Sequence, residues 1–141
     1  MRPDPSLFSL WHSVDVRFKD MDVGGHAHHS QVLVYFEEAR ARYWGEVVGK
    51  GGIDDVDFIL AEARVRYHGR ILYPQRLSVG VRVSSLGRKH FAMEYLVQSE
   101  GGEDLASGET TLVMFDYQLG RSKLMPPEVR DPIRAREGLV G

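Results

Sequence analysis

The sequence has no cysteine, which excludes disulfide bonds, thiolate catalysis and metal sites built on cysteine. It also lacks any run of about 18 apolar residues, the length that a membrane-spanning helix needs. Neither sign of charge dominates, because the net charge is only −2. Residues 1–10 contain two prolines and no apolar core of the signal-peptide kind. We therefore expect a cytoplasmic protein that binds neither nucleic acid nor membranes.

What the chain does have is an ordinary globular composition, with 43% hydrophobic and 27% charged residues over 141 positions. That length favours one domain, residues 1–141, with a sizeable buried core. We expect residues 1–10 to be a loose lead-in and residues 126–141 a short polar tail with one or two helical turns. No internal repeat or linker divides the chain.

One strand and one long helix are predicted in the first third of the chain. Apolar side chains alternate with polar ones from His12 to Phe18, which predicts a half-buried strand. Gly24 and Gly25 then break the pattern. Beyond them, apolar residues recur at steps of three and four, which predicts an amphipathic helix over residues 30–48. Ser30 or a histidine before it is the expected N-cap.

The remainder of the chain is predicted to be rich in β-strands. The pattern alternates in four segments, and the sequences L-G-R-K and E-G-G-E between them are typical of turns. Short turns imply an antiparallel meander. Since the helix has a wide apolar face, we expect an α+β fold in which a curved sheet wraps the helix. The four segments are 58–67, 77–84, 91–97 and 105–117.

Two carboxylates and three imidazoles gather between the first strand and the helix. The carboxylates are Asp20 and Asp22, and the imidazoles are three of the six histidines. A helix start presents free backbone N–H groups and the positive end of a dipole. An acid beside such donors is suited to chemistry on a carbonyl whose oxygen gains negative charge. The histidines are His26, His28 and His29.

The same cluster has a second interpretation, a metal site, because imidazole and carboxylate are ligands of zinc and iron. Spacings of two and one at a helix start do not direct three imidazoles to one point, as a pair separated by four residues would. We therefore expect no metal, and keep a histidine-rich metal-binding protein as an alternative.

The sequence R-F-K-D-M-D-V-G-G-H, followed by Y-F-E-E-A-R, resembles the hotdog-fold acyl-CoA thioesterases of the 4-hydroxybenzoyl-CoA thioesterase-like family. The resemblance covers nearly the whole chain. It implies a single hotdog domain, with a long central helix wrapped by a curved antiparallel sheet. It also implies hydrolysis of an acyl-CoA to free acid and CoA, with no cofactor. Relatives are dimers or tetramers with the site between subunits, so we expect a homodimer or homotetramer.

The resemblance assigns roles to residues around the helix start. Asp22 corresponds to the catalytic carboxylate, acting as nucleophile or as the base for a water. His26 corresponds to the histidine that orients the loop or assists proton transfer. His29 occupies the position whose backbone N–H polarises the carbonyl. We expect three neighbouring residues, Gly25, His28 and Ser30, to bind substrate. The backbone amides of residues 28–30 are expected to hold the oxyanion.

Three basic residues match positions where relatives bind the CoA phosphates. Arginine offers phosphate a two-pronged donor and lysine a mobile point charge. The simpler interpretation of these residues is a solvated, charged turn. They are Arg88, Lys89 and Arg121.

Two departures from the family pattern leave the acyl group open. His28 and His29 replace the usual Asn-Asn, and Val32 replaces a tyrosine. We expect Asp20 to be structural, bonded to backbone or to Arg17. Residues 64–70 are expected to form an exposed strand face, with Arg64 or His68 within reach of the cleft. A noncatalytic protein that binds acyl-CoA or an acyl carrier is a further alternative on the same fold.

Overall fold

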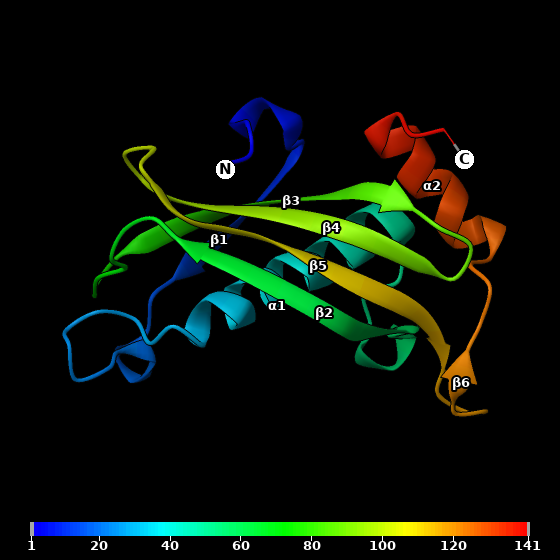
Figure 1. Cartoon of the computed structure of the whole chain (residues 1–141), viewed down its shortest axis with the longest axis horizontal. Coiled ribbons are helices and arrows are strands. Elements are labelled where there is room, and N and C mark those ends of the chain that lie inside the picture. The colour runs from blue at the N-terminus through cyan, green and yellow to red at the C-terminus, as the bar shows by residue number, and fades with distance from the viewer. Residues whose placement is uncertain (1, 141) are drawn as a thin grey trace.

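The helix α1 (Gln31–Tyr43) runs across one face of a curved antiparallel sheet in the computed structural model, which describes residues 2–140 (Figure 1). A π-helical turn, Trp44–Val48, continues α1, so the helical stretch ends where the sequence predicts. Short 3-10 turns cover Pro5–Leu7, Phe18–Asp20 and Ile53–Asp55. The strands are β1 (Leu10–Asp15), β2 (Phe58–Tyr67), β3 (Arg76–Leu86), β4 (His90–Ser99), β5 (Asp104–Asp116) and β6 (Arg121–Ser122), and a second helix, α2, spans Pro127–Glu137.

The strand order in the sheet is β1-β3-β4-β5-β2, with β6 paired to the end of β5. Leu10 pairs with Val81 in β3, and Phe58 pairs with Met114 in β5. The predicted meander is therefore correct only for β3 to β5. β2 lies at one edge of the sheet and β3 lies next to the strand at the opposite edge, because the chain after β2 crosses the sheet instead of turning back. β1 and β2 are the two edge strands.

The core forms between α1 and the sheet, as the wide apolar face of the helix predicts. Val32, Tyr35, Phe36, Ala39 and Tyr43 are each at most 2% exposed. Burying an apolar side chain the size of Val32 or Phe36 contributes roughly 1.5–3 kcal/mol. The predicted α+β architecture, a helix wrapped by a curved antiparallel sheet, is confirmed.

A glycine in β5 allows α1 to approach the sheet closely. A Cβ atom at Gly108 would overlap the Arg64 carbonyl oxygen and lie 2.8 Å from Phe36 Cε2. The Phe36 ring can therefore lie flat against Tyr95, with ring centroids 4.3 Å apart. No other residue type leaves this space empty.

The segments that the sequence predicts to be a loose lead-in and a short polar tail are both more ordered within residues 2–140. In the lead-in, Phe8 is buried at 6% exposure and packs edge-on against Trp11. The tail forms three turns of α2, rather than one or two. Its Glu137 accepts hydrogen bonds from the Tyr43 hydroxyl at 2.6 Å and from the Val83 N–H at 3.1 Å. These tertiary contacts stabilise a helix that contains an internal proline.

The first strand is shorter than predicted. It ends at Asp15, and Phe18, expected on the buried face, is 77% exposed and contacts Tyr73 edge-on at 5.8 Å. The 3-10 turn at Phe18–Asp20 rotates this side chain outward, because the alternation of a strand is lost there. In residues 2–140, no helix is both long and apolar enough to cross a membrane.

Candidate active site

Asp20 fixes the loop between β1 and α1. Its side chain is 1% exposed, and its Oδ2 accepts hydrogen bonds from the Arg17 N–H at 3.0 Å and the Tyr35 hydroxyl at 2.9 Å. Desolvation raises the pKa of Asp20, but these bonds and the Arg17 charge outweigh it, so the pKa lies below its ordinary value. The expectation that Asp20 bonds to backbone and to Arg17 is confirmed.

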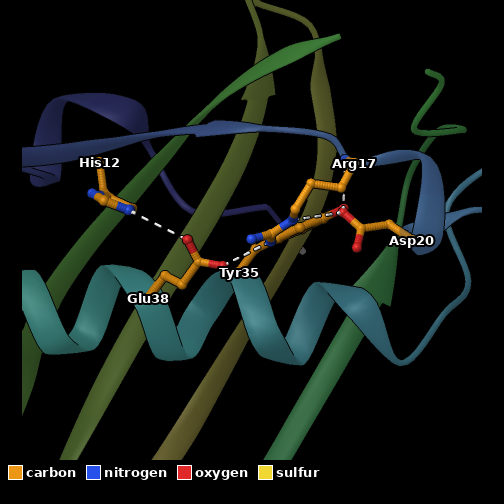
Figure 2. Close-up of polar contacts among 5 residues, drawn as sticks. All are labelled: His12, Arg17, Asp20, Tyr35 and Glu38. Carbon is orange, nitrogen blue, oxygen red and sulfur yellow. Dashed lines mark hydrogen bonds and ion pairs between the residues drawn. The ribbon is translucent and has the colours of Figure 1, made fainter. Parts of the chain in front are cut away.

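Arg17 joins this carboxylate to the outer face of α1. Figure 2 shows its guanidinium between Asp20 and Glu38, with Tyr35 rising from the helix. Arg17 Nη2 donates to Glu38 Oε2 at 2.9 Å, and His12 Nε2 lies 3.8 Å from Glu38 Oε1. The network thus connects β1, the loop and the helix, and it holds the segment that carries Asp22.

Asp22 lies on the loop with one carboxylate oxygen engaged. Its Oδ1 accepts a hydrogen bond from the Gly24 N–H at 2.8 Å, and Oδ2 lies 3.9 Å from His26 Nδ1. Desolvation raises the pKa of Asp22, but the Gly24 hydrogen bond and the imidazoles of His26 and His28 lower it, and the net shift is downward. The side chain is therefore a carboxylate at neutral pH, with Oδ2 available.

The loop turns as the two glycines predict. Gly25 has φ of 84°, in the left-handed region that favours glycine. A Cβ atom at Gly24 would lie 3.2 Å from both Asp22 Oδ1 and His26 Nε2. The turn therefore needs a small residue at Gly24 to keep the carboxylate and the imidazole close together.

The three loop histidines take different positions. His26 Nδ1 donates to the Ala27 carbonyl oxygen at 3.3 Å, which leaves Nε2 as the acceptor of the neutral ring. His28 Nδ1 accepts from the Ser30 N–H at 3.1 Å and lies 2.8 Å from Ser30 Oγ, and its ring lies 4.0 Å from that of His29. Within residues 2–140, no three histidine, aspartate or glutamate side chains are grouped to hold a metal ion.

Most backbone donors at the helix start are already engaged. The His28 N–H donates to the Asp20 carbonyl at 2.8 Å, and the Ser30 N–H donates to the His28 ring. Ser30 occupies the N-cap position but makes no side-chain capping bond. The His29 N–H has no hydrogen-bond acceptor anywhere in residues 2–140. Of the three amides predicted to hold an oxyanion, only that of His29 is available.

A surface cavity of about 410 Å³ brings several of these residues together. One wall consists of residues from the loop and the helix start, including Asp22, His26, His29 and Val32. The other wall is residues 67–71, at the end of β2 and after it. Asp22, His26 and His29 thus line one space, whereas Gly25, His28 and Ser30 do not.

The second wall contains Tyr67, which the sequence did not assign to the site, and His68, which was expected within reach of the cleft. Tyr67 donates from its hydroxyl to the His29 carbonyl oxygen at 2.7 Å, which ties β2 to the helix start. His68 lines the cavity and lies 2.8 Å from Ser107 Oγ through Nε2. Burial lowers the pKa of His68, and the Arg2 charge adds to this shift. Of the two residues expected within reach of the cleft, His68 lines the cavity and Arg64 does not.

Two of the three predicted phosphate-binding residues share a different cavity, of about 420 Å³. Lys89 and Arg121 line it together with Lys123 and Asp116, so three cations face one acid. Arg88 is exposed but does not line this cavity. In Figure 1, β6 lies at the opposite end of the molecule from the loop that precedes α1. Within one chain, these cations are therefore remote from Asp22.

The arrangement of helix, sheet and loop matches known proteins. The family model of the thioesterase-like superfamily matches residues 16–133. The chain belongs to this superfamily. The thioesterase-like fold predicted from the sequence, the hotdog fold, is thereby confirmed, and the matched residues include both cavities.

Two solved structures and one curated protein resemble this chain. A thioesterase from Thermus thermophilus, crystallised with coenzyme A and zinc, is 37% identical to this thioesterase-like chain, with a TM-score of 0.81 over 94% of this chain and 98% of the other. A DHNA-CoA thioesterase from Staphylococcus aureus shares the fold, with 20% identity, a TM-score of 0.79 and coverage of 93% and 95%. The uncharacterized protein YsmA of Bacillus subtilis (strain 168) is 23% identical over 126 residues, which are 89% of this chain and 86% of YsmA.

Proposed function

We propose that this protein hydrolyses an acyl-CoA thioester to a free acid and CoA, with Asp22 as the reacting carboxylate. The observation that carries the proposal is the cavity in which Asp22, His26 and His29 meet. A similar protein also supports the proposal, since the structure of the Thermus thioesterase contains coenzyme A. No metal or organic cofactor takes part in the proposed reaction.

The geometry suits attack on a thioester carbonyl. Asp22 Oδ2 is the oxygen without a hydrogen-bond donor in residues 2–140, so it can attack the carbonyl carbon or take a proton from an attacking water. The carbonyl oxygen becomes an oxyanion as the new bond forms, and the His29 N–H donates to it. If Asp22 attacks, the CoA thiolate departs and leaves a mixed anhydride on Asp22, and a water, deprotonated by His26 Nε2, then hydrolyses the anhydride to the free acid and restores the carboxylate. If a water attacks instead, Asp22 takes its proton, and collapse of the tetrahedral intermediate releases the CoA thiolate and the free acid.

The remote phosphate-binding cations support a dimer. β2 is an edge strand with unpaired backbone groups, and Ile59, Leu60 and Tyr67 on it are 42%, 47% and 53% exposed. An edge of this kind is normally paired or covered. We propose that two copies pair through β2 in antiparallel fashion and that their sheets join.

Antiparallel pairing would complete the site. The start of β2 lies beside the β5–β6 turn, because the Tyr117 hydroxyl donates to the Phe58 carbonyl at 2.8 Å. The end of β2 carries Tyr67 in the wall of the Asp22 cavity. When two such strands pair in antiparallel fashion, the start of one lies beside the end of the other. The Lys89 and Arg121 cavity of one copy then lies beside the Asp22 cavity of the other. CoA phosphates would then bind to one subunit and the thioester to its partner.

The test is release of free CoA from a panel of acyl-CoA esters that vary in chain length and aromaticity. We expect turnover by the wild-type protein and a loss of at least about 100-fold in kcat for Asp22→Asn, since the amide neither attacks nor removes a proton. Near-native turnover by Asp22→Asn would remove Asp22 from the chemistry. Thermal stabilisation by acyl-CoA without turnover would instead favour the noncatalytic binding protein.

A further inference from the structure

A groove runs between α1 and the edge strand β2, and two cavities lie along it. The smaller cavity, of about 170 Å³, is lined by residues of α1 together with Leu60 and Thr110 of the sheet. The larger cavity, of about 490 Å³, continues past Phe58, and its wall includes Ile53 and Val56. Leu60, Ile53 and Val56 are all exposed apolar side chains. In one chain the groove is therefore open and largely apolar.

Arg40 lines both cavities and is a buried cation, only 7% exposed. Its Nη1 donates to the Tyr95 hydroxyl at 3.1 Å, and its guanidinium lies 6.0 Å from the centre of the Phe58 ring. Within residues 2–140, no aspartate or glutamate forms an ion pair with it. Lys50, the other cation of the larger cavity, is by contrast bonded to Asp57 at 3.1 Å. Because a buried charge without a counter-charge is unfavourable, Arg40 requires a carboxylate from outside the chain.

Two donor nitrogens of Arg40 remain available for that carboxylate. Among the described residues, Nη1 alone of its side-chain nitrogens has an acceptor. The side-chain nitrogens of residues 2–140 that are both sealed from solvent and unpaired are His12 Nδ1 and Arg82 Nε. Nε and Nη2 of Arg40 are therefore still accessible through the cavities that Arg40 lines, and a guanidinium binds a carboxylate through such a pair of donors.

Glu37 is the complementary acid of the groove. It lies one turn before Arg40 on α1, lines the same two cavities and has an exposed side chain. It forms no ion pair with any of residues 2–140. Glu38, the other acid of the larger cavity, is engaged by Arg17 at 2.9 Å. One cation and one carboxylate of this groove are thus left unsatisfied in a single chain.

We infer that the groove receives α1 of a second copy, and that Arg40 of each copy pairs with Glu37 of the partner subunit. The inference rests on the proposed dimer through β2, the strand that borders the groove. In a two-fold interface every contact occurs twice, so one acid and one cation on the same face make two ion pairs. In antiparallel helices, a dyad that sets Glu37 opposite Arg40 also sets Leu33, which is exposed, opposite Trp44 in the apolar wall of the larger cavity.

Charge reversal distinguishes a pair between subunits from a pair within one chain. Glu37→Arg sets arginine against arginine in both halves of the dimer, so we expect the dimer Kd in analytical ultracentrifugation to rise at least about 100-fold. Arg40→Glu sets acid against acid and should have the same effect. An equal mixture of the two variants should form a heterodimer, since every arginine then meets an acid of the other copy. Within one chain both variants keep like charges together, so mixing would not help.

Glu46→Arg is the matched control for Glu37→Arg. Glu46 also lies in the helical stretch, but it accepts a hydrogen bond from Arg42 at 2.8 Å and lines neither cavity. We expect less than about a twofold change in the dimer Kd for this control. Circular dichroism reports whether each variant is folded. If Arg40→Glu does not fold, the contrast between Glu37→Arg and Glu46→Arg still tests the inference, because both residues replaced are exposed.

Three results would overturn the inference: a wild-type monomer at micromolar concentration, a Glu37→Arg variant that dimerises as well as the Glu46→Arg control, or two folded monomeric variants that stay monomeric when mixed. The readout is the oligomeric state, so it is separable from the chemistry. A stable wild-type dimer that releases no CoA would refute the proposed hydrolysis and leave the Glu37 and Arg40 pairing to the same test.

Discussion

The carbonyl oxygen of Asp20 accepts a hydrogen bond from the His28 N–H at 2.8 Å, across the loop that carries Asp22 and His26. Asp20 therefore fastens this loop at both ends, since its buried side chain is bonded to Arg17 and Tyr35. The two aspartates of the D-M-D sequence thus have separate tasks: one fixes the loop and the other faces the cavity.

The first prediction compares these two aspartates. Asp20→Asn should lower the free energy of unfolding by about 2–3 kcal/mol, because charge-assisted hydrogen bonds to a buried carboxylate are lost. Asp22→Asn should leave the midpoint of urea denaturation unchanged while it abolishes CoA release. Equal loss of stability in the two variants would contradict this division.

The second prediction concerns Tyr35. Removal of its hydroxyl in Tyr35→Phe takes one donor from the buried Asp20 carboxylate, which should cost about 1–2 kcal/mol of unfolding free energy. Tyr117→Phe is the matched control, because Tyr117 also donates a hydrogen bond, to a backbone carbonyl, but is 57% exposed. We expect an effect below about 0.5 kcal/mol for the control in the same urea titration.

The third prediction concerns acid. The folded-state pKa of Asp20 is depressed, so its contribution to stability is fully present above the ordinary value of 3.8 and is lost as the pH falls below it toward the folded pKa. The difference in unfolding free energy between wild type and Asp20→Asn should therefore be constant from about pH 5 to 7 and shrink below about pH 4. A difference that grows on acidification would refute the assignment.

Asp22 leads to a related expectation for activity. Because its pKa is also lowered from 3.8, Asp22 is ionised throughout the neutral range. An acidic limb of the kcat profile that is centred above pH 5 must then belong to another group. We expect Asp22→Glu, if active, to keep the position of any such limb.

The fourth prediction tests the site across two subunits. If Asp22 of one copy acts with Lys89 and Arg121 of the other, each mixed dimer of Asp22→Asn and the Lys89→Ala/Arg121→Ala double variant has one complete site. Random exchange of subunits should then restore about a quarter of wild-type activity. Mixing each variant with itself is the control. No recovery, despite exchange shown by mass spectrometry, would place both groups in the same subunit.

The fifth prediction concerns metal. Since no three histidine, aspartate or glutamate side chains are grouped within residues 2–140, dialysis against EDTA should leave CoA release unchanged. Zinc added back should not raise it. A loss of activity that zinc restores would show that the loop histidines act as ligands after all.

Much of the fold was predictable because its signals are local. The break at Gly25 and the hairpin at Gly102 both require positive φ, with observed values of 84° and 85°. The spacing of apolar residues in α1 likewise predicts its buried face. The third turn of α2 was not predictable, because Pro132 argues against it and only the distant contacts of Val129, Ile133 and Glu137 offset this.

The candidate site was predictable on one wall only. Asp22, His26 and His29 belong to a short sequence with a recognisable pattern, whereas the opposite wall is brought there by the sheet. His68 meets Ser107 across 39 positions of sequence, and Tyr67 meets His29 across 38. Pairings over such distances have no periodic signature along the chain, so only the three-dimensional structure reveals them.

The bare backbone of Gly108 sets the depth at which α1 lies against the sheet. Tyr35, one position before the Phe36 ring that covers this glycine, holds Asp20 and through it the loop of Asp22. A methyl group added at Gly108 would overlap the Arg64 carbonyl oxygen and press on the Phe36 ring, so both β2 and the helix would have to shift. The distance between the helix and the sheet therefore determines where the Asp22 carboxylate lies. We expect Gly108→Ala to displace the loop that carries Asp22 and thereby to lower activity, although the substitution lies in the sheet beneath the helix.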